Sequence, residues 1–234
     1  MSFSAVEFCA GGGGQALGLE LAGFECAGAV EIDLDCCATL RMNRPRWDTR
    51  QDDMREVDGL RWKGVDLFAA GVPCPPFSIA GKQLGGNDER DMFPTALDLI
   101  RKIQPNALLL ENVKGFASAK FETYRRGLFE KLEKMGYQAE WKILHASDFG
   151  VPQLRPRFIL VGMRPEYFEY FKWPEPQSDV GTVGYILEDL MAVNEWQGVA
   201  NWVEHANHIA PTIVGGSKKH GGPDLGPTRA KAKW

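Results

Sequence analysis

The sequence lacks the features that mark membrane-spanning and secreted proteins. No run of about 18 apolar residues occurs, so no membrane span is predicted. The N-terminus has no charged start followed by an apolar block, so no secretory signal is predicted either. These absences predict a cytoplasmic protein, or a nuclear one in a cell that has a nucleus.

Cysteine is scarce and irregularly spaced. The five cysteines are Cys9, Cys26, Cys36, Cys37 and Cys74. Their odd number argues against a disulfide framework, and the absence of a Cys-x-x-Cys pair argues against a zinc ribbon. His205 and His208 have no cysteine or acid at a suitable spacing, so no metal site is predicted.

The chain also lacks the positive charge that many nucleic-acid-binding proteins carry. The formal net charge is −4, although hydrophobic (44%) and charged (25%) contents are those of a globular domain. The charge is uneven, because residues 211–234 contain four lysines and one arginine but a single acid, Asp224. This basic segment is either a local anion-binding face or a solvated tail, and both interpretations stay open.

Short apolar segments alternate with helical ones through about residue 163. Strands are predicted at 4–9, 26–31, 66–70, 107–110, 139–144 and 158–162, and helices at 15–21, 33–42, 92–102 and 121–135. This order predicts a Rossmann-like α/β fold with a mostly parallel sheet covered by helices. The last two strands have no helix between them, which predicts an antiparallel edge. Residues 1–173 are expected to form a catalytic, cofactor-binding domain, and residues 174–234 an incomplete second region with a helix at 182–193.

A glycine run follows the first predicted strand. Gly11 to Gly14 let the backbone approach a ligand and offer N–H groups at a helix start, although a flexible turn explains them equally well. Glu31 follows the second strand, about 20 residues further on, where an acid can bind ribose hydroxyls. Because no Gly-Lys-Ser/Thr sequence ends the loop, a ribose-containing cofactor fits better than a nucleoside triphosphate.

Three further features follow later strands. Cys74 lies between prolines. Taken alone, this pattern fits an ordinary turn cysteine. Supported by the other motifs, it favours an exposed thiol on a stiff loop. Glu111 ends a buried strand, where a carboxylate suits a proton donor or, alternatively, a helix cap. Arg155 and Arg157 are two residues apart on an extended segment and face one side, toward a polar site or toward solvent. The carboxyl ends of parallel strands share one edge, where ligands bind.

In the order of these motifs the chain resembles the DNA cytosine-5 methyltransferase family, over about residues 4–163. The resemblance implies S-adenosylmethionine as cofactor and double-stranded DNA as substrate. It implies cofactor contacts from Cys9, Ala10, Gly11, Gly12, Gly13, Gly14, Glu31, Ile32, Asp53, Met54, Gly71 and Pro73. It implies Cys74 as the nucleophile that attacks cytosine C6, and Glu111, Arg155 and Arg157 as the groups that hold and polarise the base.

The sequence departs from the family pattern at several points. Cys9 stands where the family usually has a phenylalanine that stacks on adenine, and Phe8 is predicted to point to the opposite face. Pro75 stands where glutamine is common. The resemblance implies that residues 174–234 are only the start of the family's target-recognition region. The family's late arginine-rich and glycine–asparagine segments are not found, so we expect a truncated chain or one half of a split enzyme with a second polypeptide as partner.

Three other interpretations remain at this point. A tRNA cytosine-5 methyltransferase can share the fold, the cysteine and the glutamate. A binding module with an incomplete cofactor pocket would lack turnover. A nicotinamide-dependent Rossmann enzyme explains the glycines and Glu31, but it leaves Cys74, Glu111 and the arginine pair unexplained.

Overall fold

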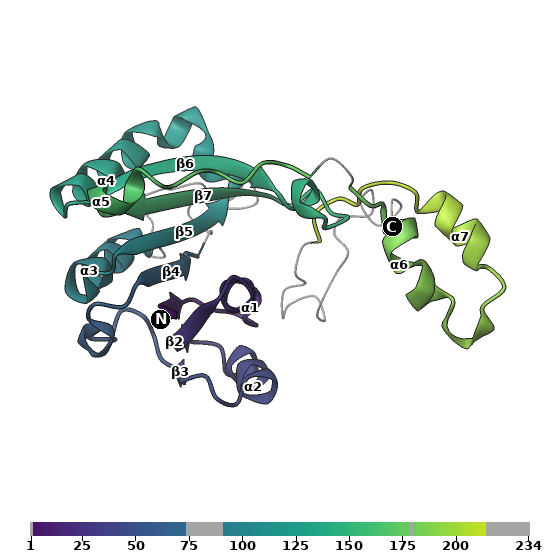
Figure 1. The fold of residues 1–234 in the computed structure, drawn as a ribbon, viewed down its shortest axis with the longest axis horizontal. Helices are drawn as coiled ribbons and strands as arrows, with labels where there is room; N and C mark the ends of the chain where they lie inside the picture. Colours follow the sequence, from purple (N-terminus) through teal and green to yellow (C-terminus); the bar gives the residue numbers. More distant parts are fainter. Residues whose placement is uncertain (1, 74–90, 178–179, 214–234) are drawn as a thin grey trace. The chain divides into compact units, whose positions relative to one another are not determined.

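A seven-stranded sheet forms the centre of the fold (Figure 1). The computed structural model describes residues 2–73, 91–177 and 180–213. The strands are β1 Phe3–Phe8, β2 Phe24–Glu31, β3 Thr49–Gln51, β4 Leu67–Gly71, β5 Ala107–Val113, β6 Gln138–His145 and β7 Pro156–Met163, in the order β3-β2-β1-β4-β5-β7-β6. The pairs from β3 to β5 are all parallel. Since the sheet as a whole is mixed, its antiparallel part lies at the β7-β6 end, and the predicted fold class is confirmed.

Local sequence signals place the helix ends. The helices are α1 Gly14–Leu21, α2 Leu34–Asn43, α3 Phe93–Ile103, α4 Glu122–Lys134, α5 Pro165–Phe168, α6 Val183–Met191 and α7 Val199–His205. The Asp33 carboxylate caps α2 by accepting from the backbone N–H groups of Asp35 (2.9 Å) and Cys36 (3.0 Å). Gly136, with φ 83°, takes the left-handed conformation that ends α4. No helix in the three described ranges is both long and apolar enough to cross a membrane.

Aromatic side chains fill the core beneath the carboxyl ends of β1 and β4. Phe8 and Phe68 are fully buried and their rings stack with centroids 5.1 Å apart. Trp62 meets Phe8 edge-on at 5.5 Å, and its indole N–H donates to the carbonyl of Ala27 (3.0 Å). Because Phe8 points into this core, the next residue faces the opposite side, as the alternation along β1 predicts.

The chain divides into two compact units, which we describe separately. Residues 1–142 and 158–172 form the first, and residues 143–157 and 173–234 form the second. In the second unit α6 and α7 cross so closely that a Cβ on Gly184 would lie 2.4 Å from the carbonyl oxygen of Val203. The backbone N–H of Leu154 donates to the carbonyl of Ala210 (2.9 Å), which ties the segment 143–157 to the end of the described chain.

Candidate functional site

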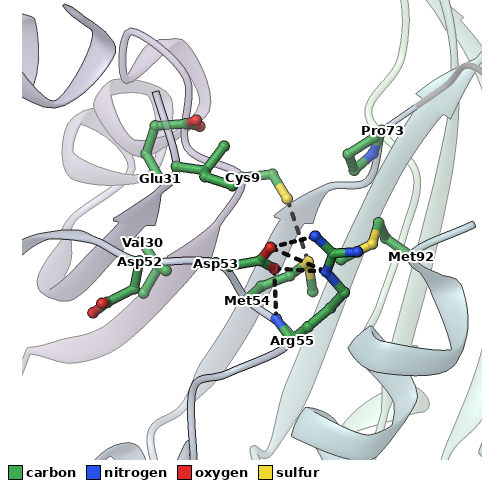
Figure 2. A pocket seen from close by; sticks show the side chains of 10 residues that line it. Cys9, Val30, Glu31, Asp52, Asp53, Met54, Arg55, Pro73 and Met92 are labelled. Carbon is green, nitrogen blue, oxygen red and sulfur yellow. Dashed lines mark hydrogen bonds and ion pairs between the residues drawn. The ribbon is translucent and has the colours of Figure 1, made fainter. Parts of the chain in front are cut away.

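The ends of four parallel strands, β1 to β4, surround a cavity of about 330 Å³ in the first unit (Figure 2). Its lining residues are Cys9, Val30, Glu31, Ile32, Asp52, Asp53, Met54, Arg55, Pro73 and Met92. The strand register explains this convergence, because Phe8 pairs with Val30 on one side and with Ala70 on the other. The residue that follows each strand therefore reaches the same edge, which is the usual ligand-binding edge of a parallel sheet.

Cys9 forms one wall of the cavity, as expected from the burial of Phe8 on the other face. Its φ of 55° is in the left-handed region, which is uncommon for a residue with a side chain. Burial, and then the nearby carboxylate of Glu31, raise the pKa of the Cys9 thiol to about 12. The neutral thiol therefore donates, and it lies 3.4 Å from the sulfur of buried Met54 (Figure 2). Two sulfur atoms thus make this wall apolar and polarisable.

Glu31 connects the glycine loop to the start of α2. Its Oε2 accepts from the backbone N–H of Gly11 (2.7 Å), and its Oε1 accepts from that of Asp33 (2.8 Å). The loop needs glycine at Gly13, where φ is 89° and an added Cβ would lie 2.5 Å from Leu40. An added Cβ would meet nothing within 4 Å at Gly12. The loop is thus closely packed on one side and open on the other.

Asp53 and Arg55 form an ion pair at the cavity wall (Figure 2). The Arg55 guanidinium bonds both carboxylate oxygens, and the Arg55 backbone N–H donates to Oδ1 (2.9 Å). These hydrogen bonds lower the pKa of Asp53. The carboxylate therefore stays ionised near neutral pH and presents an acceptor beside the cavity.

Glu111 lies at the same sheet edge. It pairs with Gly71 across β4 and β5. A Cβ on Gly71 would lie 3.9 Å from Glu111 Oε2 and 3.6 Å from the carbonyl oxygen of Cys9. The Glu111 carboxylate and the carbonyl of Cys9 therefore both lie next to Gly71. Asn112 is fully buried, and its Nδ2 donates to the carbonyl of Val72 (3.2 Å).

The structure brings together half of the residues predicted to bind a cofactor. Those that line the cavity are Cys9, Glu31, Ile32, Asp53, Met54 and Pro73. Ala10 instead packs in a small buried cluster with Ala29 and Leu40. Gly11, Gly12, Gly13 and Gly14 form the adjacent loop and the start of α1, and Gly71 ends β4.

The predicted catalytic residues are placed unevenly. Cys74 lies outside the described residues. Arg155 and Arg157 belong to the second unit, where Arg155 has φ 26° and Arg157 Nη1 donates to the carbonyl of Pro156 (3.0 Å). Glu111 belongs to the first unit, where its carboxylate lies near Gly71, as does the carbonyl of the cavity residue Cys9.

Sequence reasoning missed four lining residues, which are Val30, Asp52, Arg55 and Met92. The Asp-x-Arg spacing of Asp53 and Arg55 is a local signal for the ion pair, because at a turn the arginine side chain can contact a carboxylate two residues earlier in the sequence. Met92 has no comparable signal, since it lies far along the chain from the other lining residues.

Comparison with known proteins agrees with this geometry. Residues 3–223 match the family model described as C-5 cytosine-specific DNA methylase. The Type II methyltransferase M.NaeI of Lentzea aerocolonigenes is 55% identical over 236 residues, covering 100% of this chain and 57% of the relative. The Type II methyltransferase M.NgoMIV of Neisseria gonorrhoeae is 53% identical over 215 residues, covering 92% and 69%. This chain thus spans little more than half to about two thirds of these relatives.

Two solved structures share the fold. An E. coli prophage protein described as a DNA modification methyltransferase has a TM-score of 0.67 at 25% identity, covering 80% of this chain and 54% of that one. A DNMT2 variant of Spodoptera frugiperda has a TM-score of 0.58 at 25% identity, covering 76% and 54%. With the family model matching nearly the whole chain, and with two relatives above 50% identity, this chain belongs to the C-5 cytosine-specific DNA methylase family.

Proposed function

We propose that the protein is a Type II DNA (cytosine-5-)-methyltransferase, which transfers a methyl group from S-adenosylmethionine to C5 of cytosine in double-stranded DNA. One observation carries the proposal: the residues that surround the cavity all fall within the stretch that matches the methylase family. The names of M.NaeI and M.NgoMIV support a role in a restriction–modification system.

The cavity fits the adenosyl part of this cofactor. Its volume of about 330 Å³ is that of a small-molecule site. Each oxygen of Glu31 keeps a lone pair beyond the one used by the backbone, which supports the proposal that Glu31 accepts bonds from ribose hydroxyls. Asp53 is an ionised acceptor for the adenine amine. Cys9 and Met54 offer a sulfur-rich surface to the adenine ring in place of the family's aromatic residue. When bound, S-adenosylmethionine supplies the methyl group.

The chemistry on the base belongs to this chain's own residues. The Cys74 thiolate adds to C6 of cytosine, and the new sulfur–carbon bond makes C5 nucleophilic. Glu111 holds N3 and the exocyclic amine and shares a proton as charge develops on N3. Arg157, together with Arg155, hydrogen-bonds the base carbonyl and polarises the ring. After C5 has gained its methyl group, loss of the C5 proton expels Cys74 and restores the aromatic base.

Glu111 is the part of this mechanism that the described geometry supports most directly. Its carboxylate lies beside Gly71, three residues before Cys74 in the sequence. The target base must leave the duplex stack to reach these groups, at a cost of a few kcal/mol.

DNA is the proposed macromolecular partner, and residues 174–234 are proposed as the beginning of a target-recognition region. In the relatives a large part of the length lies outside the matched stretch. We propose that the corresponding part reaches this protein either as further sequence or as a second polypeptide. An enzyme that modifies cellular DNA works in the compartment that holds it, which in a bacterium is the cytoplasm.

The test is transfer of a labelled methyl group from S-adenosylmethionine, by the full protein, to duplex DNA or to tRNA. We expect 5-methylcytosine in DNA alone. Cys74→Ser should abolish transfer while leaving cofactor affinity within about twofold, because the side chain acts on the base. Cys36→Ser, in α2, is the matched cysteine control and should change neither.

Each alternative has its own outcome in this test. Transfer to tRNA alone would identify a tRNA methyltransferase. Tight cofactor binding without transfer to either nucleic acid would identify a binding module. Normal transfer by Cys74→Ser would show that the nucleophile is misassigned.

A further inference from the structure

Arg55 holds the Asp53 carboxylate through three of its hydrogen-bond donors. Its Nε lies 3.0 Å from each carboxylate oxygen, its Nη2 bonds Oδ2, and its backbone N–H donates to Oδ1 (2.9 Å). A carboxylate offers about four lone-pair sites, so these donors leave about one of them free. Because the bonds reach both oxygens, they fix the plane of the carboxylate as well as its position.

The backbone around this pair is held by contacts that do not involve the Arg55 side chain. The Glu56 N–H donates to the Asp53 carbonyl (2.9 Å) and closes a turn. Met54 is buried inside this turn, and its sulfur accepts from the Cys9 thiol (3.4 Å). The freedom that Asp53 would otherwise keep is rotation of its own side chain, and the bonds from Arg55 remove it.

The pair contributes both a buried acceptor and a cation to the cavity (Figure 2). The Asp53 side chain is 17% exposed and that of Arg55 59%, so the carboxylate is the more enclosed partner. Glu31 and Asp52 add two more carboxylates, and Arg55 is the one cation among the described residues that line the cavity. Arg55 thus offsets the charge of one acid, and its bonds lower the pKa of Asp53, which stays ionised.

A fixed, ionised acceptor can distinguish two purine rings that differ in one group. Adenine carries an amine at C6, which donates, whereas hypoxanthine carries a carbonyl oxygen there, which only accepts. A carboxylate held in one orientation bonds the amine and repels the carbonyl oxygen. A carboxylate that was free to rotate could turn away from the carbonyl oxygen, and this discrimination would decrease.

We propose that Arg55 is a positioning residue that makes the cofactor site selective for the amine of adenine, because it fixes the orientation of the Asp53 carboxylate. The selectivity rests on the proposed function, in which S-adenosylmethionine binds in this cavity. The hold of Arg55 on Asp53 does not rest on it.

The first measurement is calorimetry of the full protein with two ligands. One is S-adenosylhomocysteine, the cofactor without its methyl group, and the other is S-inosylhomocysteine, in which a carbonyl oxygen replaces the amine. The unaltered protein should bind the amine compound about thirtyfold more tightly, as expected for one hydrogen bond to a charged group. Arg55→Ala should reduce this ratio to about threefold, because a mobile carboxylate avoids the repulsion. Arg55→Lys keeps the charge without the planar fork and should give an intermediate ratio.

Arg50→Ala is the matched control. Asp48 and Arg50 have the same spacing as Asp53 and Arg55 and also form an ion pair (3.0 Å), but neither of them lines the cavity. Arg50→Ala should therefore leave the ratio of affinities unchanged. Asp53→Asn should reduce the ratio as well, and Arg55→Ala added to it should cause no further reduction, since Arg55 acts through Asp53.

The second measurement is titration of the Asp53 carboxyl carbon by NMR in the absence of ligand. Arg55→Ala should move the midpoint of this titration to higher pH, because bonds that favour the ionised form are lost. Arg50→Ala should leave the midpoint unchanged. The other acids of the cavity, Glu31 and Asp52, are the same in both variants, so the difference reports the bonds from Arg55.

These results separate the two claims. Equal ratios in the unaltered protein and Arg55→Ala overturn the selectivity role, as does an equal reduction in Arg50→Ala. Tighter binding of both compounds by Arg55→Ala also overturns it, because Arg55 would then compete with the ligand for Asp53. An unchanged Asp53 titration overturns the hold on the carboxylate. If the unaltered protein binds neither compound nor S-adenosylmethionine, the proposed cofactor site and its selectivity fall together, whereas the titration still decides whether Arg55 holds Asp53.

Discussion

Glu7 is a buried acid whose replacement should change how stability depends on pH. It is 3% exposed in the middle of the sheet, on β1, where it pairs with Ala29 on one side and Ala69 on the other. Its carboxylate accepts from the backbone N–H of Ala16 in α1, but Oε2 has no hydrogen-bond partner among the described residues. Burial, opposed by this one bond and reinforced by the charge of Glu31, raises the pKa of Glu7 from 4.5 to about 8.

The direction of the pH effect follows from this shift. Between the unfolded pKa and the folded pKa, the native protein keeps the Glu7 proton while the unfolded chain has lost it. Stability therefore decreases as pH rises through this window, by about 1.4 kcal/mol per unit for one proton. The Glu31 carboxylate on β2 opposes a negative charge on Glu7, while Glu20 and the thiol of Cys26 line the same small pocket from α1 and β2.

Glu7→Gln removes the titrating group and keeps the shape. Glutamine retains the acceptor for Ala16, and its amide nitrogen replaces the unpartnered oxygen at a cost that does not depend on pH. Relative to the unaltered protein, the variant should gain roughly 3 kcal/mol of unfolding free energy between about pH 5 and pH 7.5. At any single pH, the difference in unfolding free energy between the two proteins also contains the pH-independent cost of the amide nitrogen. The change of this difference with pH is therefore the informative quantity.

The assay is urea unfolding of both proteins at several pH values across this window, with the m-value checked for constancy. Glu25→Gln is the control, because Glu25 is an exposed carboxylate on the neighbouring strand. Parallel stability curves for Glu7→Gln and the unaltered protein would refute the argument that Glu7 is protonated in the folded state. A larger pH-dependent change in Glu25→Gln than in Glu7→Gln would refute it as well.

Two further predictions concern the cavity and its loop. Asp53→Asn should weaken S-adenosylmethionine binding about tenfold by calorimetry, because it removes an ionised acceptor. Asp98→Asn is the control, because it also loses an ion pair but lies away from the cavity, and it should leave the affinity unchanged. Equal affinities for the two variants would contradict the assignment of Asp53. Gly13→Ala should destabilise the protein by about 2 kcal/mol or more in urea unfolding, because of its left-handed φ and the contact with Leu40. Gly12→Ala, where the space is open, is expected to change stability little, and a similar loss in both variants would show that the contact with Leu40 is unimportant.

Much of the fold follows from short-range sequence signals. Asp33 before an apolar run predicts a helix cap, and the structure has that cap. The alternation along β1 predicts that Phe8 and Cys9 face opposite sides, and they do so. In contrast β3 has only three residues, Thr49–Gln51, too few to show a strand period, and it forms because β2 offers it a partner.

The site was predictable where residues directly follow strands, and not where distant segments meet. Glu31 is such a residue, since parallel strands align their ends. The hydrogen bond from the Tyr124 hydroxyl to the Asp91 carboxylate joins positions 33 residues apart, and nothing in the local sequence of either predicts it. The burial of Glu7 was also not predicted. The sequence around it alternates as in an ordinary strand, and Glu7 is buried because helix α1 packs against this face of the sheet.

The central claim is that Cys74 forms a covalent bond to C6 of a cytosine in DNA. A duplex in which fluorine replaces the C5 hydrogen of the target cytosine tests this most directly, because the C5 proton whose loss would expel the thiolate is absent. With S-adenosylmethionine present, the full protein should form a stable protein–DNA adduct, and peptide mass spectrometry should locate it on Cys74. The absence of an adduct with a substrate duplex, an adduct on another cysteine, or an adduct that persists in Cys74→Ser would contradict the account.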